Sequence, residues 1–96
     1  MKEAKDCENM NDIRVEIDDI DSKIINLIAK RATYVNKAAQ FKKNETEVKA
    51  PLRVENMLKQ RRLWAEEKNV NPEFIEQLFK DMVNYFINKE MSEWKK

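Results

Sequence analysis

Four charged residues interrupt apolar stripes at positions where the buried face of a helix should carry no charge. Arg31 and Lys42 lie on one such stripe, Arg61 lies on a second, and Glu90 lies on a third. For any one of these residues the better interpretation is that the charged group reaches solvent or pairs with a neighbour, and we interpret Arg61 in this way. For Arg31, Lys42 and Glu90 together that interpretation weakens, because burying three charges is costly unless each is compensated.

The spacing of the cations indicates what they could bind. Arg31 and Lys42 are 11 residues apart, so on one continuous helix they would share a face, about 16 Å apart along the axis. Arg14 would lie about 42 Å from Lys42 on that helix, and it could reach the same ligand only from a second, antiparallel chain. The sequence therefore predicts a pocket for a small di-anion, lined by cations from two chains and closed by a loop over residues 43–50. Arginine forks suit the carboxylates of such a ligand.

The composition excludes several classes of function. The 96 residues include no glycine, no histidine and one cysteine, and 19 cationic against 18 anionic side chains give a net charge of +1. This balance gives no overall attraction to nucleic acid, and the missing histidines remove both a zinc-type ligand set and the usual general base. No apolar run reaches membrane-spanning length, and the N-terminal residues lack an apolar signal segment. We expect a cytoplasmic protein without membrane association, metal or cofactor.

Hydrophobic periodicity predicts an all-α protein with three helices in a single domain over residues 1–96. The first helix is expected to start at a cap formed by Asn11 or Asp12 and to continue to about residue 43 or 44. The polar segment that follows is expected to be a mobile loop.

Proline and asparagine mark the ends of the other two helices. Pro51 suits the first turn of the second helix, and Asn69 suits a left-handed residue at its end. Asn71 is expected to cap the third helix, with Pro72 in its first turn.

The first helix is too long for a small monomer. Roughly 32 residues of helix measure about 48 Å, which exceeds the diameter of a compact domain of this size. Two shorter helices of the same chain cannot cover its whole apolar stripe. We therefore expect a homodimer in which the two long helices pack antiparallel about a two-fold axis.

These segments resemble a known family. "DCENMNDIRVEIDDIDSKIINLIAKR" resembles the first helix of the all-helical chorismate mutase family, and more narrowly of its isochorismate pyruvate-lyase branch, the bacterial salicylate-forming enzymes. The likeness continues through "YVNKAAQFK", "APLRVENMLKQRRLWAEE" and "FIEQLF", and covers nearly the whole chain. Typical mutases carry a glutamate that binds a substrate hydroxyl where this chain has Val54, and in this respect the chain is similar to the lyase branch.

The resemblance implies an intertwined helical homodimer with two sites for a di-anionic substrate, isochorismate or chorismate. It implies that Arg14 of the neighbouring chain binds one substrate carboxylate and that Arg31 binds the pyruvyl carboxylate. Lys42 would bridge that carboxylate and the ether oxygen of the bond that breaks, and Arg53 would hold the loop side of the site. The implied apolar wall consists of Val35, Ala38, Val54, Met57, Phe86 and Ile87.

Two positions depart from the pattern of the family. The lyase branch usually has glutamine where this chain has Glu90, and an amide can donate a hydrogen bond to the ether oxygen whereas a carboxylate cannot. One hypothesis is that Glu90, like Lys42 a predicted catalytic residue, acts in its protonated form, so that activity is shifted to acid pH. The alternative is that Glu90 pairs with Lys42 when no ligand is bound. Lys43 stands where a small residue is usual and adds a charge beside the site.

Three functions follow from these observations. The leading prediction is an isochorismate pyruvate-lyase that works by a pericyclic mechanism and has weaker chorismate mutase activity. The runner-up is a chorismate mutase proper, in aromatic amino-acid biosynthesis. The third is a non-catalytic helical dimerisation module, which would keep the apolar stripes but would not need Arg14, Arg31 and Lys42 in register.

Overall fold

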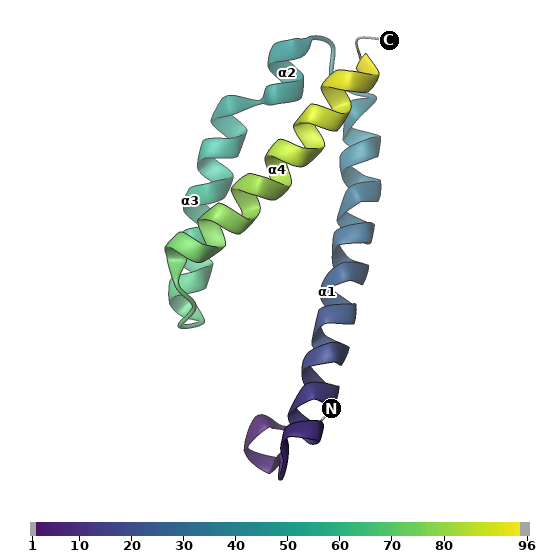
Figure 1. The fold of residues 1–96 in the computed structure, drawn as a ribbon. Helices are drawn as coiled ribbons and strands as arrows, with labels where there is room; N and C mark the ends of the chain where they lie inside the picture. Colours follow the sequence, from purple (N-terminus) through teal and green to yellow (C-terminus); the bar gives the residue numbers. More distant parts are fainter. Residues whose placement is uncertain (1, 95–96) are drawn as a thin grey trace. The chain divides into compact units, whose positions relative to one another are not determined.

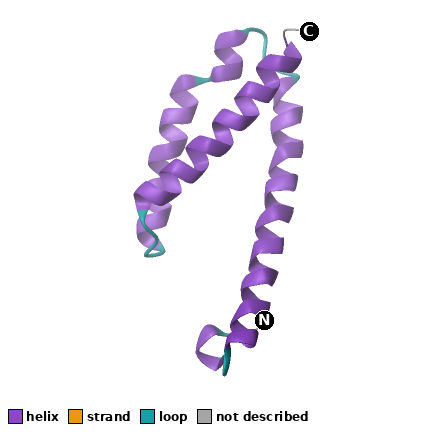
Figure 2. Cartoon of the chain, viewed as in Figure 1, coloured by secondary structure: helices purple, strands orange, loops and turns teal. Residues whose placement is uncertain are grey.

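The computed structural model describes residues 2–94, and these residues are helical with no β-strand among them (Figures 1 and 2). The predicted all-α class is confirmed. No helix within this described range combines the length and the apolar character needed to cross a membrane. The elements in chain order are a 3-10 turn η1 (Ala4–Asp6) and the helices α1 (Met10–Ala39), α2 (Glu45–Lys49), α3 (Pro51–Glu67) and α4 (Pro72–Trp94).

The chain divides into two compact units, one up to Val35 and one from Asn36 onward. The first contains η1 and most of α1, and the second contains the last turn of α1 together with α2, α3 and α4. A single domain over residues 1–96 stays a prediction.

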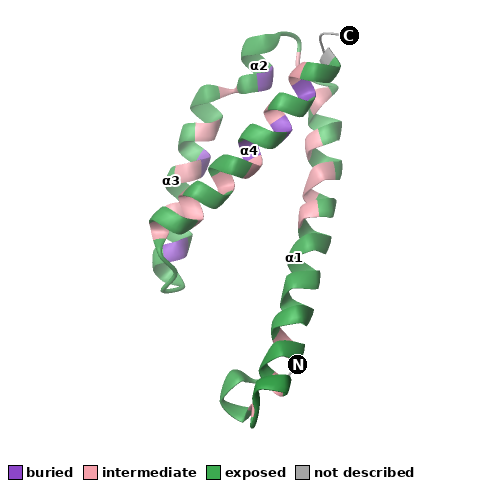
Figure 3. Ribbon diagram, viewed as in Figure 1, coloured by how far each residue is buried: buried purple, intermediate pink, exposed green. Residues whose placement is uncertain are grey.

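The first unit is essentially one helix, and it buries none of its described side chains (Figure 3). The predicted apolar stripe is present on α1, but Ile13 is 38% exposed, Ile17 is 49% exposed and Ile24 is 48% exposed. A lone helix has no neighbour within its own unit against which to pack. Its stripe is therefore available to another surface.

The start of α1 is capped two or three residues earlier than the sequence predicted. The side chain of Asn9, rather than of Asn11 or Asp12, accepts a hydrogen bond from the backbone N–H of Asp12 at 2.8 Å. Asp12 accepts in return from the backbone N–H of Glu8 at 3.1 Å. This hydrogen bond, followed by that from Lys2, holds the pKa of the Asp12 carboxyl below its ordinary value.

The second unit contains the hydrophobic core. α4 packs against α3 and, nearer its C-terminal end, against α2 (Figure 1). Apolar residues recur at three- and four-residue spacing on α4, so they share the face that meets these helices. The buried apolar residues of this unit are Val48, Met57, Ala65, Val83 and Phe86.

The predicted signals at the junction of α3 and α4 are confirmed. Asn69 is left-handed, with φ 60°, and the N–H of Val70 donates to the carbonyl of Ala65 at 2.9 Å, which closes the end of α3. The Asn71 side chain accepts from the backbone N–H groups of Glu73 at 2.8 Å and Phe74 at 3.2 Å. The junction is thus built from local hydrogen bonds that the sequence already specifies.

Arg62 of α3 forms hydrogen bonds to α4 beside this junction. Its guanidinium donates to Glu76 of α4 at 2.8 Å and to Glu73 at 3.2 Å. The pKa of Glu73 is lowered by a hydrogen bond from its own backbone N–H and then by Arg62. The same two carboxylates raise the pKa of Arg62 further above its ordinary value.

The segment after α1 differs from the prediction in two ways. α1 ends at Ala39 rather than near residue 43, because the next three N–H groups bond three residues back, as in the tight last turn of a helix. Residues 43–50, predicted to be a mobile loop, contain the short helix α2, which Asn44 caps. Apolar residues continue past Ala39, so the periodicity alone placed the end of the helix too late.

Ala50 links α2 to α3 in a left-handed conformation, with φ 39° and ψ 57°. A Cβ makes this conformation unfavourable by about 1–2 kcal/mol, and this chain has no glycine to relieve it. Pro51 follows directly and starts α3. The link therefore stores local backbone strain.

Replacing this strained alanine should stabilise the protein. Ala50→Gly is expected to raise the free energy of unfolding by about 0.5–1 kcal/mol, since the relieved strain exceeds the extra freedom of the unfolded chain. Ala29→Gly, the same change at an exposed position inside α1, should lower it by about 1 kcal/mol. Urea unfolding followed by circular dichroism at one protein concentration measures both. If Ala50→Gly lowered the free energy of unfolding as Ala29→Gly does, Ala50 would not be strained.

The lowered pKa of Glu73 predicts a pH-dependent contribution to stability. Such a carboxyl stabilises the folded state above its ordinary value of 4.5, and this contribution is lost as the pH falls through the lower folded value. Glu73→Gln should therefore lower the melting temperature at pH 7 and make little difference at pH 2. Glu67→Gln, at an exposed position on α3, is the control. An equal deficit of the Glu73 variant at both pH values would show that its charge plays no part.

Candidate active site

Lys42 and Glu90 form a partly buried ion pair in the second unit. The Lys42 Nζ lies 3.1 Å from a carboxylate oxygen of Glu90, and the side chains are 24% and 7% exposed. The pairing of these two residues in the absence of ligand, which the sequence offered as the alternative to a protonated Glu90, is confirmed. Each charge compensates the other. This compensation is needed because an unpaired charge is costly to bury.

Glu90 is held on the inner face of α4. It lies seven residues after Val83 and four after Phe86, which are both buried, so helical spacing carries it onto the same face. The carboxylate is therefore fixed by the packing of an entire helix. A charged group held in this way is positioned without flexible support from a loop.

Lys42 comes from the turn just after α1. Its N–H donates to the carbonyl of Ala39 at 3.2 Å, the last of three successive bonds of this kind. Because the helix has already ended, the predicted spacing of Arg31 and Lys42 along one continuous helix is wrong. Lys42 reaches Glu90 from a tight turn rather than from a helical face.

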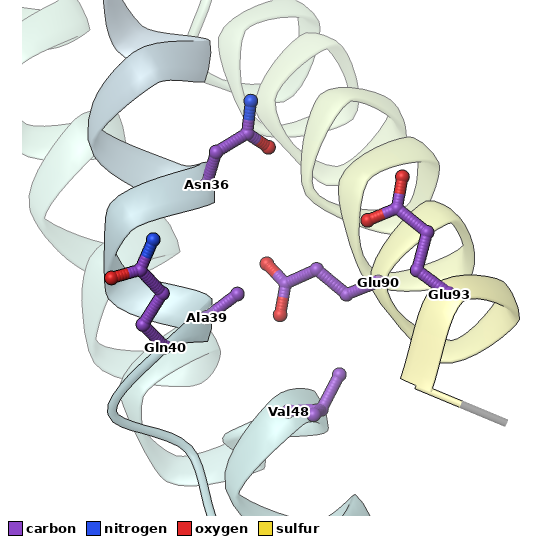
Figure 4. Close-up of a pocket in the computed structure, with 6 residues that line it drawn as sticks. All are labelled: Asn36, Ala39, Gln40, Val48, Glu90 and Glu93. Atoms are coloured by element: carbon purple, nitrogen blue, oxygen red, sulfur yellow. The ribbon is translucent and has the colours of Figure 1, made fainter. Parts of the chain in front are cut away.

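An open pocket of about 290 Å³ lies beside the ion pair. Figure 4 shows the Glu90 carboxylate extending from α4 toward the methyl group of Ala39, with Val48 of α2 on another side. The pocket is lined by both polar and apolar groups. Such a lining suits a small ligand that carries charged groups on a carbon skeleton. The lining residues are Asn36, Ala39, Gln40, Val48, Glu90 and Glu93.

The charges around the pocket are mixed. Glu90 and Glu93 supply carboxylates, and the ammonium of Lys42 lies against Glu90. Gln40 accepts a hydrogen bond from Lys37 at 3.1 Å. Within residues 2–94 the structure places no group of three or more acidic or cysteine side chains that could hold a metal ion.

The structure brings part of the predicted site together. Lys42 and Glu90 are in contact, and the second unit also contains the other predicted residues from position 38 onward. The remaining three predicted residues, Arg14, Arg31 and Val35, belong to the first unit. In the second unit Met57 and Phe86 are buried, Val54 and Ile87 are half-buried, and Ala38 and Arg53 are exposed.

Arg61, which the sequence analysis assigned a structural role, packs against aromatic rings. Its guanidinium carbon lies 4.7 Å from the ring centre of Trp64 and 5.7 Å from that of Phe79. Cation–π contacts of this kind favour a half-buried arginine. Arg61 therefore contributes to packing between α3 and α4.

Five pocket residues were missed by the sequence analysis. Glu93 follows Glu90 by three residues on α4, and helical spacing could have placed it on a neighbouring part of the same face. Val48 was assigned to a loop, so no buried face was expected for it. The others lie in the last turn of α1 and directly after it, where neither the polar residues nor the alanine gave a distinguishing signal. The missed residues are Asn36, Ala39, Gln40, Val48 and Glu93.

Comparison with known proteins confirms the resemblance seen in the sequence. The profile of the chorismate mutase type II family matches residues 13–91, which include both Lys42 and Glu90. The chain is also 38% identical over 95 residues to the isochorismate pyruvate lyase of Pseudomonas aeruginosa. That alignment covers 99% of this chain and 94% of the relative. The chain belongs to the chorismate mutase type II family.

Proposed function

We propose that this protein is an isochorismate pyruvate-lyase, which converts isochorismate to salicylate and pyruvate, with secondary chorismate mutase activity. The observation that carries the proposal is the 38% identity to an isochorismate pyruvate lyase over almost the whole of both chains. The alignment therefore includes the turn that bears Lys42 and the helix that bears Glu90. Membership of the chorismate mutase type II family supports the secondary activity.

The proposed reaction makes few chemical demands on the protein. A ring hydrogen moves to the methylene of the enolpyruvyl group as the C–O bond breaks, in one cyclic transition state. No side chain has to act as nucleophile or as general base. The protein has to hold a compact substrate conformer and to stabilise the negative charge that grows on the ether oxygen.

Lys42 is the proposed source of that stabilisation. Its ammonium group has three donors, so it can bind the pyruvyl carboxylate and the ether oxygen together. In the free protein this group contacts Glu90 at 3.1 Å. Substrate binding then transfers at least one donor of Lys42 from Glu90 to the substrate.

Three arginines are the proposed carboxylate ligands. Arg31 binds the pyruvyl carboxylate, Arg14 of a second chain binds the ring carboxylate, and Arg53 holds the side of the site nearest α2. The planar fork of arginine matches a carboxylate in two hydrogen bonds. The proposed apolar wall around the ring is formed by Val35, Ala38, Val54, Met57, Phe86 and Ile87.

A homodimer completes the proposed site. The exposed stripe on α1 supports it, since Ile13, Ile17 and Ile24 are each more than a third exposed in the single chain. Antiparallel packing of two such helices would cover both stripes and bring Arg14 of one chain near Lys42 of the other. A cytoplasmic location stays a prediction.

A chorismate mutase proper is the second candidate. The family match over residues 13–91 favours it directly. It would use the same cations on chorismate, whose rearrangement to prephenate is also pericyclic. Val54 argues against it, because a typical mutase has a glutamate there for a substrate hydroxyl.

One assay separates these candidates. The purified protein is given isochorismate and, separately, chorismate at pH 5 and pH 8, and salicylate, pyruvate and prephenate are measured. Salicylate with an equal amount of pyruvate supports the lyase, and prephenate without salicylate supports the mutase. If neither substrate is converted at either pH, the catalytic proposal is wrong and a non-catalytic helical module remains.

Replacing Glu90 should raise the activity. A carboxylate beside the ether oxygen repels the negative charge that grows there, whereas the amide of a glutamine can donate a hydrogen bond to that oxygen. Glu90→Gln should therefore exceed wild type in kcat with isochorismate by roughly 10-fold or more. The measurement is kcat of both forms at pH 8.

A control for this variant is Asp81→Asn, which removes an exposed carboxylate of α4 that accepts from Gln77. It should keep the wild-type kcat. Equal kcat values of wild type and Glu90→Gln would refute the proposed effect of Glu90.

Mixing two inactive variants tests whether each site draws on two chains. Arg14→Ala and Lys42→Ala should each lose activity by about 100-fold or more. After unfolding and refolding as an equal mixture, half of the dimers combine both variants, and one of their two sites is intact. The mixture should recover about a quarter of wild-type activity. No recovery, with heterodimers verified by mass spectrometry, would place Arg14 and Lys42 of one chain in the same site.

A further inference from the structure

The backbone is held on both sides of Lys42. On one side its own N–H donates to the carbonyl of Ala39 at 3.2 Å. On the other side the N–H of Lys43 donates to the carboxylate of Glu47. Because each peptide unit is planar, these two bonds fix the planes that flank the Cα of Lys42. They therefore set the direction in which its side chain leaves the backbone.

Glu47 is itself held by Asn44. The backbone N–H of Glu47 donates to the side-chain oxygen of Asn44 at 2.9 Å, and the N–H of Val48 donates to the backbone carbonyl of Asn44 at 3.1 Å. The two side chains thus satisfy N–H groups at the start of α2 in a reciprocal arrangement. We call Asn44, Glu47 and the three hydrogen bonds they accept the α2 cap.

α2 depends on this cap. A helix of five residues is far too short to be stable by its own hydrogen bonds. Its one buried side chain is Val48, which also lines the pocket. Without the cap, little would hold residues 43–47 in place, and the peptide plane after Lys42 would be free to turn.

We propose that Asn44 and Glu47 are positioning residues that aim Lys42 at the reacting atoms. This inference rests on the proposed function, in which the Lys42 ammonium stabilises the charge on the ether oxygen. Neither residue lines the pocket, so each acts through Lys42 rather than on the substrate. A shift of about 1 Å in a catalytic group can lower a rate by about 100-fold, so a loose turn would be costly.

Asn71 provides a matched control. It caps α4 through the same kind of side-chain bond, to the N–H groups of Glu73 and Phe74. It lies 19 residues before Glu90 on that helix, about 28 Å away along the axis. Loss of this cap should therefore reduce stability without moving Lys42.

The first test is steady-state kinetics with isochorismate. Asn44→Ala and Glu47→Ala should each lower kcat by about 10- to 100-fold and change KM less. Asn44→Ser and Glu47→Gln keep an oxygen that can accept the same bonds, and they should stay within about 3-fold of wild type. Asn71→Ala should keep wild-type kcat. An equal loss of kcat in Asn71→Ala and Asn44→Ala would overturn the proposal.

The second test asks whether the cap acts through Lys42. In a Lys42→Ala background, Asn44→Ala should cause no further loss of kcat, because the group that it aims is absent. If the same 10- to 100-fold loss appears again in that background, the cap acts on something else and the proposal is wrong.

A third test does not depend on catalysis. Trypsin cleaves after lysine in mobile segments, so Asn44→Ala and Glu47→Ala should be cleaved after Lys42 and Lys43 faster than wild type or Asn71→Ala. Equal cleavage rates in these two variants and in wild type would show that the α2 cap does not hold the turn in place. If wild type converts neither isochorismate nor chorismate, that failure belongs to the proposed function, and the cleavage rates still decide whether the cap holds the turn.

Discussion

The ion pair between Lys42 and Glu90 is the interaction on which the pocket depends. Taking either charge out of water costs several kcal/mol, and each is tolerated only while the other stays in place. The pair joins the turn after α1 to the C-terminal half of α4, while Val48 of α2 covers a neighbouring side. The turn and α2, which are neighbours in sequence, are thus held against the distant C-terminal half of α4 around one charge pair. A substrate anion in the proposed reaction therefore has to compete with an internal anion for the same ammonium.

Local chemistry allowed much of the fold to be predicted. Asn69, Asn71 and Pro51 act at the helix ends where the sequence placed them, because capping and left-handed turns depend on only a few neighbouring residues. The end of α1 was not predictable in this way, because apolar residues continue beyond Ala39. Nor was α2, since five residues give no measurable period. Its formation depends on the reciprocal bonds of Asn44 and Glu47 and on the burial of a single valine.

The site was predictable only in part, for a related reason. The pairing of Lys42 with Glu90 could be predicted because two opposite charges each interrupted an apolar stripe. The predicted spacing of Arg31 and Lys42 is wrong because it required one continuous helix, whereas α1 ends at Ala39. Gln40 and Ala39 line the pocket because the end of α1 lies beside α2 and α4. Neither glutamine nor alanine is a residue type that indicates a pocket from sequence. Tertiary contacts, rather than composition, select the lining of this pocket.

The first unit carries a consequence for the protein in solution. Residues 10–35 form a helix that buries no side chain within its own unit, although isoleucines repeat along one face. Such a helix gains little stability from packing until it finds a partner surface. With a second copy as that partner, folding of this segment becomes a bimolecular reaction. Its extent then follows mass action, and dilution alone would shift the equilibrium toward less ordered chains.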